Sequence, residues 1–315
     1  MRRRSVLRRG LGVLLPALAA AIALAAPATA QAQTRVYWIA AVPVTWNVVP
    51  NGHDVMTGME FPTDQTTLQT VVYKAYTPWW GKPLPDVPWI IGDNDGIPGP
   101  TIHARVGDDI LVHFKNLDFV FKRPHSMHFH GVEYDPSSDG AYIPGFSGPG
   151  AEVMPGSSFT YVLHAGPESA GVWPYHDHSP SMEESIAGGL YGALSILGLH
   201  DRRPDKEFVI FFESMLNFMT INGHAFLGNT PVPHARVGDL VQWDVLALGD
   251  DFHTFHIHGH RWLDRSGVPR DTQIVGPAES YRIRFVEDHP GPWLYHCHVE
   301  SHMMNGMIGL YVVRK

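Results

Sequence analysis

Short runs in which apolar and polar residues alternate are the main pattern along this chain. Residues 110–114 read Ile-Leu-Val-His-Phe, and residues 281–285 read Tyr-Arg-Ile-Arg-Phe. Alternation with a period of two is typical of a strand with one buried face. The 31 Gly and 26 Pro interrupt such runs throughout, and no long stretch of sequence shows a helical period. The pattern predicts an all-β protein of many short strands, arranged as a sandwich or as Greek-key barrels.

Three sequence blocks occur twice and in the same order. Residues 103–108 recur unchanged at 234–239. A His-x-His-Gly block and a Trp-x-Tyr-His-x-His block follow in each copy, and the three offsets are 131, 128 and 120 residues. Two copies of one domain are the simplest account of this order. A polar stretch near residues 200–206 breaks the strand pattern, so we predict a linker there. The first domain, with an N-terminal extension, is then 31–199 and the second is 207–315.

The first thirty residues have the composition of an export signal. Five Arg form a basic start, an apolar run extends over residues 11–26, and Ala28-Thr29-Ala30 supplies the small residues that signal peptidase prefers. Arg3-Arg4 followed by Ser-Val-Leu also resembles a twin-arginine signal, with a general secretory signal as the alternative. We therefore expect residues 1–30 to be a signal peptide that is removed. The protein should be secreted, or located in the periplasm or cell envelope.

Charge restricts the partners that the protein is expected to bind. Because residues 1–30 carry five Arg and no acidic residue, their removal changes the formal charge from −8 to −13. An acidic surface disfavours nucleic acid and anionic membranes as partners, so we expect neither. The single cysteine, Cys297, rules out an internal disulfide. A lone thiol in an oxidising compartment needs a reason, and coordination to a metal is one.

Histidine is abundant, and eight of the 20 His form pairs separated by one residue. The pairs are His128/His130, His176/His178, His256/His258 and His296/His298. Residues i and i+2 of a strand point to the same face, so each pair can present two imidazoles to one centre. Eight imidazoles exceed what one ion accepts, and imidazole is a good ligand for copper. The pairs therefore predict a cluster of several copper ions.

A second centre is predicted around the cysteine. Cys297 lies between His296 and His298, with His302 and Met307 five and ten residues after it. His253 precedes the third His-x-His pair by three residues. Two imidazoles, a thiolate and a weak axial thioether are the ligands of a blue-copper electron-transfer site.

The first repeat cannot form such a blue-copper site. Asp177 stands where Cys297 stands in the second repeat, with Met182 in place of His302 and Ala187 in place of Met307. Only His125 matches its counterpart, His253. We therefore expect electrons to enter in the second domain alone and His125 to be a hydrogen-bonded relic.

These motifs resemble the multicopper oxidases, and the two-domain length resembles the small two-domain bacterial laccases. The likeness covers most of the chain, including residues 97–102 (Ile-Pro-Gly-Pro-Thr-Ile), 221–223 (Ile-Asn-Gly) and all four His-x-His blocks. It implies two cupredoxin-like Greek-key β-barrel domains with four copper ions per chain. Type 1 copper would be bound by His253, Cys297, His302 and Met307, and type 2 copper by His128 and His256. The type 3 pair would be bound by His130, His176, His178, His258, His296 and His298.

The resemblance also implies an activity, a laccase that oxidises phenols and aromatic amines and reduces O₂ to water. The substrate would give up single electrons near His253 or His302, and Cys297 would conduct them to the cluster through His296 or His298. Tyr134 and Asp139 would relay protons. Residues 137–140 (Ser-Ser-Asp-Gly) also form a good turn on their own, which is the alternative interpretation of Asp139. Further relay candidates are Glu300 and Asp177.

Each predicted domain holds half of the cluster histidines, so the cluster must lie between a first and a second domain. The two domains can come from one chain or from neighbours, and the resemblance implies a homotrimer with clusters between chains. Alternative functions are a cuprous or other metal-ion oxidase, a copper nitrite reductase and a copper electron carrier. The nitrite reductase and the carrier need fewer histidines than the four pairs supply. The remaining histidines are interpreted as ordinary polar residues, namely His53, His103, His113, His164, His200, His224, His234, His260 and His289.

Overall fold

The computed structural model describes residues 32–87 and 90–315, and the predicted signal peptide lies outside these ranges. Strands dominate the described residues, and the longest of their helices has six residues. The helices are α1 (Thr63–Thr66), α2 (Met182–Ala187) and α3 (Glu300–Met304), with 3-10 turns η1 (Pro78–Trp80), η2 (Pro136–Ser138) and η3 (Pro149–Ala151). The all-β prediction is confirmed. None of the helices in the described part of the chain is long and apolar enough to cross a membrane.

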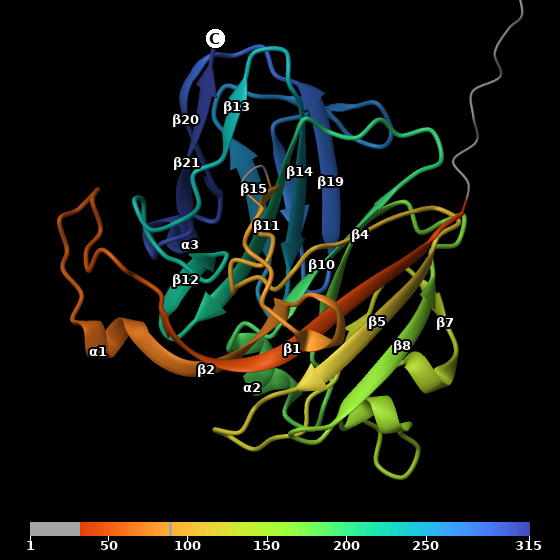
Figure 1. The fold of residues 1–315 in the computed structure, drawn as a ribbon. Coiled ribbons are helices and arrows are strands. Elements are labelled where there is room, and N and C mark those ends of the chain that lie inside the picture. Colours follow the sequence, from red (N-terminus) through yellow and green to blue (C-terminus); the bar gives the residue numbers. More distant parts are fainter. Residues whose placement is uncertain (1–31, 88–89) are drawn as a thin grey trace, which may run out of the picture. The chain divides into compact units, whose positions relative to one another are not determined.

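The first half of the chain forms two sheets that enclose a core (Figure 1). One sheet has the order β2-β1-β5-β8-β7, with β2 (Thr67–Ala75), β1 (Thr34–Asn47), β5 (Asp109–Asn116), β8 (Ser158–His164) and β7 (Glu133–Tyr134). The other has the order β4-β10-β9-β6, with β4 (Ile102–Arg105), β10 (Tyr191–Leu197), β9 (Gly171–His176) and β6 (His128–Phe129). Buried side chains between them include Phe114, Phe129 and Tyr161.

The second half repeats this plan. One sheet has the order β12-β11-β14-β19, with β12 (Phe218–Ile221), β11 (Lys206–Met215), β14 (Leu240–Ala247) and β19 (Ser280–Val286), and β3 (Ile90–Ile91) also pairs with β11. The other has the order β13-β21-β20-β15-β18, with β13 (His234–Arg236), β21 (Ile308–Arg314), β20 (Gly291–Cys297), β15 (His253–Ile257) and β18 (Thr272–Val275). A hairpin joins β16 (Trp262–Leu263) to β17 (Pro269–Arg270). Trp243 lies at the centre of this core, in contact with Phe255, Tyr295 and Tyr311.

The two halves match strand for strand. β1 runs parallel to β5, as β11 runs parallel to β14, and β4 runs parallel to β10, as β13 runs parallel to β21. The two runs that alternate most clearly in the sequence lie within β5 and β19, each of which faces its core with every second residue. The duplication in the sequence therefore produces two Greek-key barrels.

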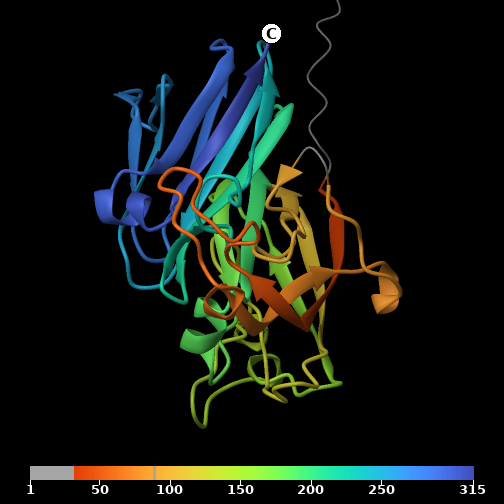
Figure 2. The ribbon, with the colours of Figure 1, turned by 90° about the vertical axis from the view of Figure 1, so that its left-hand side faces the viewer.

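The N-terminal extension does more than add an edge to the first barrel. β2 is an edge strand, but β1 lies inside its sheet, because its 14 residues pair with β2 on one side and β5 on the other. The chain after β1 then contacts the second half. The Trp46 indole donates to Gly223 O at 2.7 Å, and Asn51 N–H donates to Asn229 Oδ1 at 2.8 Å. This segment ties the two barrels together (Figure 2).

A buried ionic network also joins the barrels. Arg282 of β19 donates to both carboxylate oxygens of Asp244, at 2.9 and 3.1 Å, and to Ser195 Oγ of β10 at 2.8 Å. Ser195 in turn donates to Glu207 at 2.6 Å, and His103 Nε2 lies 3.0 Å from the same carboxylate. Since the charges are paired and hydrogen-bonded, their burial is tolerated and fixes how the barrels meet.

Candidate metal centres

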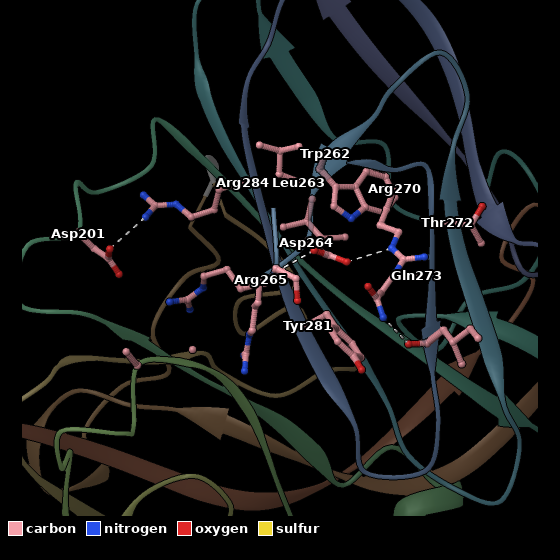
Figure 3. A pocket seen from close by; sticks show the side chains of 16 residues that line it. Asp201, Trp262, Leu263, Asp264, Arg265, Arg270, Thr272, Gln273, Tyr281 and Arg284 are labelled. Carbon is pink, nitrogen blue, oxygen red and sulfur yellow. Dashed lines mark hydrogen bonds and ion pairs between the residues drawn. The ribbon is translucent and has the colours of Figure 1, made fainter. Parts of the chain in front are cut away.

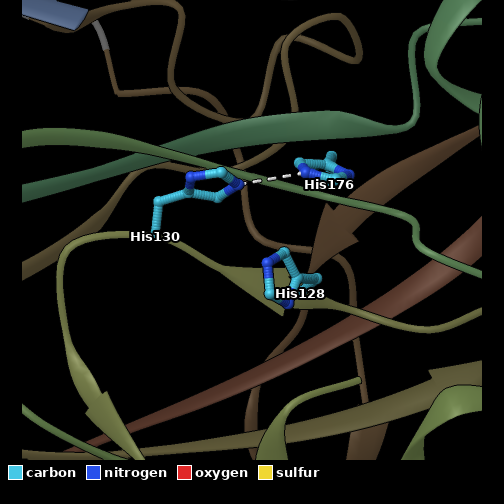
Figure 4. A group of neighbouring side chains, drawn as sticks. All are labelled: His128, His130 and His176. Atoms are coloured by element: carbon cyan, nitrogen blue, oxygen red, sulfur yellow. Dashed lines mark hydrogen bonds between the residues drawn. The ribbon is translucent and has the colours of Figure 1, made fainter. Parts of the chain in front are cut away.

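The first two His-x-His pairs come together at one end of the β6–β9 sheet and form what we call the first quartet. His128 pairs with His176 across the two strands, while His130 and His178 lie just beyond the strand ends. The ring centroids of the quartet are 5.1–5.8 Å apart along the contacts His128–His130, His128–His178 and His176–His178. His130 Nε2 and His176 Nε2 are 3.2 Å apart (Figure 4). Three of the four imidazoles, those of His128, His130 and His176, place a ring nitrogen within 4.8 Å of one another, and His178 packs beside them.

The other two pairs form a second quartet in the same way. His256 pairs with His296 across β15 and β20, and His258 and His298 follow just after the strands. Ring centroids are 5.3 Å apart for His256–His258 and 5.4 Å apart for His296–His298. His258 Nε2 and His296 Nε2 are 3.1 Å apart. In all four His-x-His pairs the two imidazole rings lie next to each other.

Backbone carbonyls hold half of these imidazoles in one tautomer. Nδ1 of His128 donates to Asp139 O at 2.7 Å, and Nδ1 of His256 donates to Asp271 O at 2.6 Å. Nδ1 of His176 and of His296 donates to the carbonyl of the next residue, at 2.9 and 2.8 Å. With the proton kept on Nδ1, the lone pair of Nε2 is free to bind a metal.

The quartets also favour uncharged imidazoles. Burial, together with the neighbouring imidazoles, lowers the pKa of His130 and of His176 to about 4. Burial likewise lowers the pKa of His258 and of His296. Neutral imidazole is the form that binds metals, so these groups are ready to act as ligands at neutral pH.

Cys297 lies with two histidines in a separate, buried group. Its Sγ is 3.9 Å from His253 Nδ1 and 3.8 Å from His302 Nδ1, and the two Nδ1 atoms are 3.3 Å apart. Ligands that sit about 2.0–2.3 Å from a shared ion are separated by distances of this size. These distances show that Nδ1 of His253 faces the sulfur, and His253 Nε2 is buried with no hydrogen-bond partner in the described part of the chain.

The surroundings of Cys297 suit a bound thiolate. Thr254 N–H donates to Sγ at 3.4 Å, which favours negative charge on the sulfur. Burial nevertheless raises the pKa of the Cys297 thiol, so a cation is needed to keep it ionised. Met307 is fully buried in the same core, and its carbonyl accepts from Cys297 N–H at 3.1 Å. The two imidazoles and the thiol therefore fit a copper ion with N and S donors.

In the first barrel, the position that corresponds to the Cys297 group is occupied by charged and hydrogen-bonded side chains. Asp177 is fully buried and accepts from Ser126 N–H and Ser179 Oγ, both at 2.7 Å. His125 Nδ1 faces its carboxylate at 3.6 Å, and His125 Nε2 lies 3.3 Å from Asp118. These partners hold the pKa of Asp177 below its ordinary value despite burial, which acts to raise it. The interpretation of His125 as a hydrogen-bonded relic agrees with this geometry.

The predicted relay residues lie at different distances from the histidines. The Tyr134 ring is 6.3 Å from that of His128, and Asp139 Oδ1 is 3.4 Å from His128 Nδ1. Burial and the adjacent Asp139 carboxylate raise the pKa of Tyr134. Glu300 is exposed at the start of α3. Tyr134 and Asp139 therefore adjoin the first quartet.

Sequence reasoning missed one group near the second quartet. His260 is buried, donates from Nδ1 to His258 O at 2.7 Å, and has Nε2 3.1 Å from Glu287. Tyr311 donates its hydroxyl to the same carboxylate, and His289 lies beside it at the surface. Glu287 is 27 residues from His260, so no local sequence motif indicates that the two side chains are in contact. Because both nitrogens of His260 are bonded within the protein, the group braces the His258 backbone.

The two quartets do not meet within one chain. Every ring contact of the first quartet is to its own members or to Tyr134, and every ring contact of the second is to its own members, across residues 32–87 and 90–315. Each quartet alone falls short of the eight imidazoles that the sequence supplies.

Known proteins that resemble this chain include copper enzymes, in agreement with the nitrogen and sulfur ligands described above. Two multicopper oxidase models match the chain, one over residues 76–200 and the other over residues 200–315. The chain belongs to the multicopper oxidase family. Membership implies that the metal of these centres is copper.

Curated relatives of this oxidase include a mouse (Mus musculus) protein named Ferroxidase HEPHL1, which is 31% identical over 90% of the chain. A probable nitrite reductase-hydroxylamine oxidoreductase fusion protein of Kuenenia stuttgartiensis is 34% identical over 71% of the chain.

The oxidase covers only 29% of the length of the mouse relative and 28% of that of the Kuenenia relative. Solved structures match it along most of both chains. A multicopper oxidase crystal structure superposes with a TM-score of 0.67 at 26% identity, covering 89% of each chain. A blue copper oxidase from Nitrosomonas europaea has the same fold, with a TM-score of 0.66 at 21% identity, covering 89% of this chain and 86% of its own. The two cupredoxin-like domains that the resemblance implied are thus confirmed.

Proposed function

We propose that this multicopper oxidase is a laccase-like enzyme that takes single electrons from phenols or aromatic amines and reduces O₂ to water. The observation that supports this most strongly is the pairing of one Cys-His-His group with two His quartets, since blue copper alone needs no quartet. A nitrite reductase or an electron carrier has no use for two separate quartets of imidazoles.

Four copper ions per chain would use all the predicted ligands. His253, Cys297, His302 and Met307 would hold the type 1 ion. His128 and His256 would hold the type 2 ion, and the other six quartet histidines would hold the type 3 pair. Copper bound there would supply one-electron transfer at the type 1 site and O₂ reduction at the cluster. We place the domains at 31–199 and 207–315, and removal of residues 1–30 during export would expose them to an oxidising compartment.

The fold supports one entry point for electrons. His302 is half-buried, whereas His253 is fully buried, so a substrate can reach only the His302 imidazole. Cys297 lies between His296 and His298 in the sequence, and this short covalent path leads to the second quartet. Tyr134 and Asp139 adjoin the first quartet and would pass protons from the surface. Their role as relay rests on this proximity.

The separation of the quartets supports a cluster shared between chains. If the first quartet of one copy met the second quartet of the next, eight imidazoles would surround one site. Such a head-to-tail contact closes without free ends in a ring, and a homotrimer is the ring that we propose.

Optical spectroscopy and copper counting on the loaded protein test this function. We expect a strong band near about 600 nm from the thiolate and a shoulder near about 330 nm from the cluster, with about four copper ions per chain. Cys297→Ser should remove the 600 nm band and keep the shoulder. Two copper ions per chain without the shoulder would contradict the cluster, and the chain would then have to be a nitrite reductase relative or an electron carrier.

A metal-ion oxidase is the second candidate, and one structural feature favours it. Asp250 and Asp251 precede His253 in the sequence. Burial and the neighbouring His302 lower the pKa of His253 to about 4, and the charge of Asp251 acts in the opposite direction. Carboxylates at this position would attract a small cation, and the mouse relative is named a ferroxidase. Rates with Fe²⁺ and with a neutral phenol separate the two functions. Asp251→Asn should lower kcat/KM for Fe²⁺ at least about tenfold and leave the phenol unchanged if metal ions are the substrate.

A further inference from the structure

A short loop beside the first quartet exposes two large apolar side chains. The loop comprises residues 142–147, and Tyr142 N–H at its base donates to His178 O at 2.9 Å. Ser147 N–H donates to Ile143 O at 3.1 Å and closes the turn. Phe146 is 87% exposed and Ile143 is 52% exposed. Covering a phenylalanine side chain contributes about 1.5–3 kcal/mol, so an ordered loop of this kind is suited to bury its tip against a partner.

Exposed apolar side chains also lie beside the second quartet. His256 pairs with Thr272, and Thr272 Oγ1 is 3.3 Å from His256 Nδ1. Since alternate residues of a strand share a face, Ile274 lies on the same face of the sheet as His256. Ile274 is 60% exposed, and Leu263 on the neighbouring hairpin is 67% exposed. Both line a cleft of about 710 Å³ that also includes Thr272 (Figure 3).

The charges around the loop and the cleft are complementary. Residues 131–140, which lead from the first quartet to the loop, contain Glu133, Asp135 and Asp139 and no basic residue. The cleft is lined by four arginines and two aspartates. Three of these arginines are paired, Arg270 with Asp264 at 3.0 Å, Arg284 with Asp201 at 3.8 Å and the buried Arg282 with Asp244 at 2.9 Å. Arg265 has no ion-pair partner among the described residues. An acidic approach that meets the unpaired Arg265 would favour one register between two copies.

We infer that residues 142–147 of one copy dock in this cleft of the next copy, with Ile143 and Phe146 packed against Leu263 and Ile274. The inference rests on the proposed sharing of the cluster between chains, which brings the two quartets together. Phe146 is four residues from Tyr142, so their Cα atoms are at most about 14 Å apart, and Ile274 lies about 7 Å along the strand from Thr272. Both patches are therefore within reach of a shared cluster. The contact would cover the exposed imidazoles of His258 and His298 and exclude water from them.

Disulfide trapping between two singly substituted chains tests the contact. One tagged, copper-loaded full chain carries Phe146→Cys, and a second chain with a different tag carries Ile274→Cys or Leu263→Cys. The two are mixed, allowed to exchange subunits and oxidised. A disulfide needs Cβ atoms about 3.5–4.5 Å apart, so we expect a linked heterodimer with at least one partner. Phe119, which is 60% exposed on another loop, provides the control, and Phe119→Cys should form no link.

A second measurement uses the strength of assembly, by analytical ultracentrifugation of copper-loaded protein. Phe146→Asp should raise the concentration at which the oligomer dissociates at least about tenfold, and Phe119→Asp should not change it. Oligomers that bind four copper ions, form no link and tolerate Phe146→Asp would overturn the docking contact and leave the proposed function intact. A chain that remains monomeric with the complete 330 nm shoulder would overturn both the docking contact and the shared cluster.

Discussion

A single buried carboxyl group should make the stability of this oxidase depend on pH in an unusual direction. Glu213 of β11 is 3% exposed, and its Oε1 accepts from Ser214 N–H at 2.9 Å. Its Oε2 has no hydrogen-bond partner in the described part of the chain. Burial, with a smaller contribution from the negative charges of Asp250 and Asp251, raises the pKa of Glu213 to about 8. The folded protein therefore prefers the protonated acid.

The size of the effect follows from the two pKa values. The unfolded chain releases this proton near pH 4.5, whereas the folded chain retains it to about pH 8. Between these values the folded state binds one more proton, so the free energy of unfolding decreases by about 1.4 kcal/mol per pH unit. Over the full interval the loss is at most about 5 kcal/mol, and it is complete above about pH 8.

Glu213→Gln removes the titration and nearly preserves the shape of the side chain. At pH 5 the variant should be equally stable, or less stable by about 1 kcal/mol, since its amide must find an acceptor. At pH 8.5 it should be more stable than the parent by about 2–4 kcal/mol. Urea unfolding of the metal-free chain, followed by tryptophan fluorescence at one protein concentration, measures both differences.

The control is Glu168→Gln, an exposed glutamate whose substitution should leave the pH dependence unchanged. If Glu213→Gln and the parent lost stability in parallel between pH 5 and pH 8.5, the assignment of the buried proton to Glu213 would be wrong. A variant that was less stable by the same amount at both pH values would show a packing role for the side chain and no titration.

Three further changes test the surroundings of the centres. Asp177→Ala removes the acceptor that faces His125. It should lower the free energy of unfolding of the metal-free chain, measured in urea, by about 3–5 kcal/mol. A decrease below about 1 kcal/mol would show that His125 and Asp177 do not form an ion pair. Glu287→Ala leaves His260 without its carboxylate partner and should lower the free energy of unfolding by a similar amount. Unchanged stability would contradict the role of His260 and Glu287 in holding the His258 backbone. Asp139→Asn should lower the turnover of a phenol about 10–100-fold while the 600 nm band is kept, and unchanged turnover would favour the turn interpretation of Asp139.

Much of the architecture could be predicted because its causes are local. Alternation along residues 110–114 and 281–285 identified strands that became β5 and β19. The repeated blocks indicated two equivalent domains, since a duplicated sequence meets the same packing requirements twice. His-x-His spacing placed each pair on one side, because the geometry of an extended chain alternates its side chains regardless of the rest of the fold.

The sequence by itself thus determined the two barrels, the imidazole pairs and the donor set around Cys297. Tertiary structure decided everything that depends on which distant segments meet. It placed Asp271 O on His256 and Asp118 beside His125. It buried His253 while leaving His302 half-buried, and it joined His260 to Glu287. It also kept the two quartets apart within the chain. Hydrogen-bond partners and exposure arise from the packing of sheets whose strands lie far apart in sequence, and no local spacing encodes that packing.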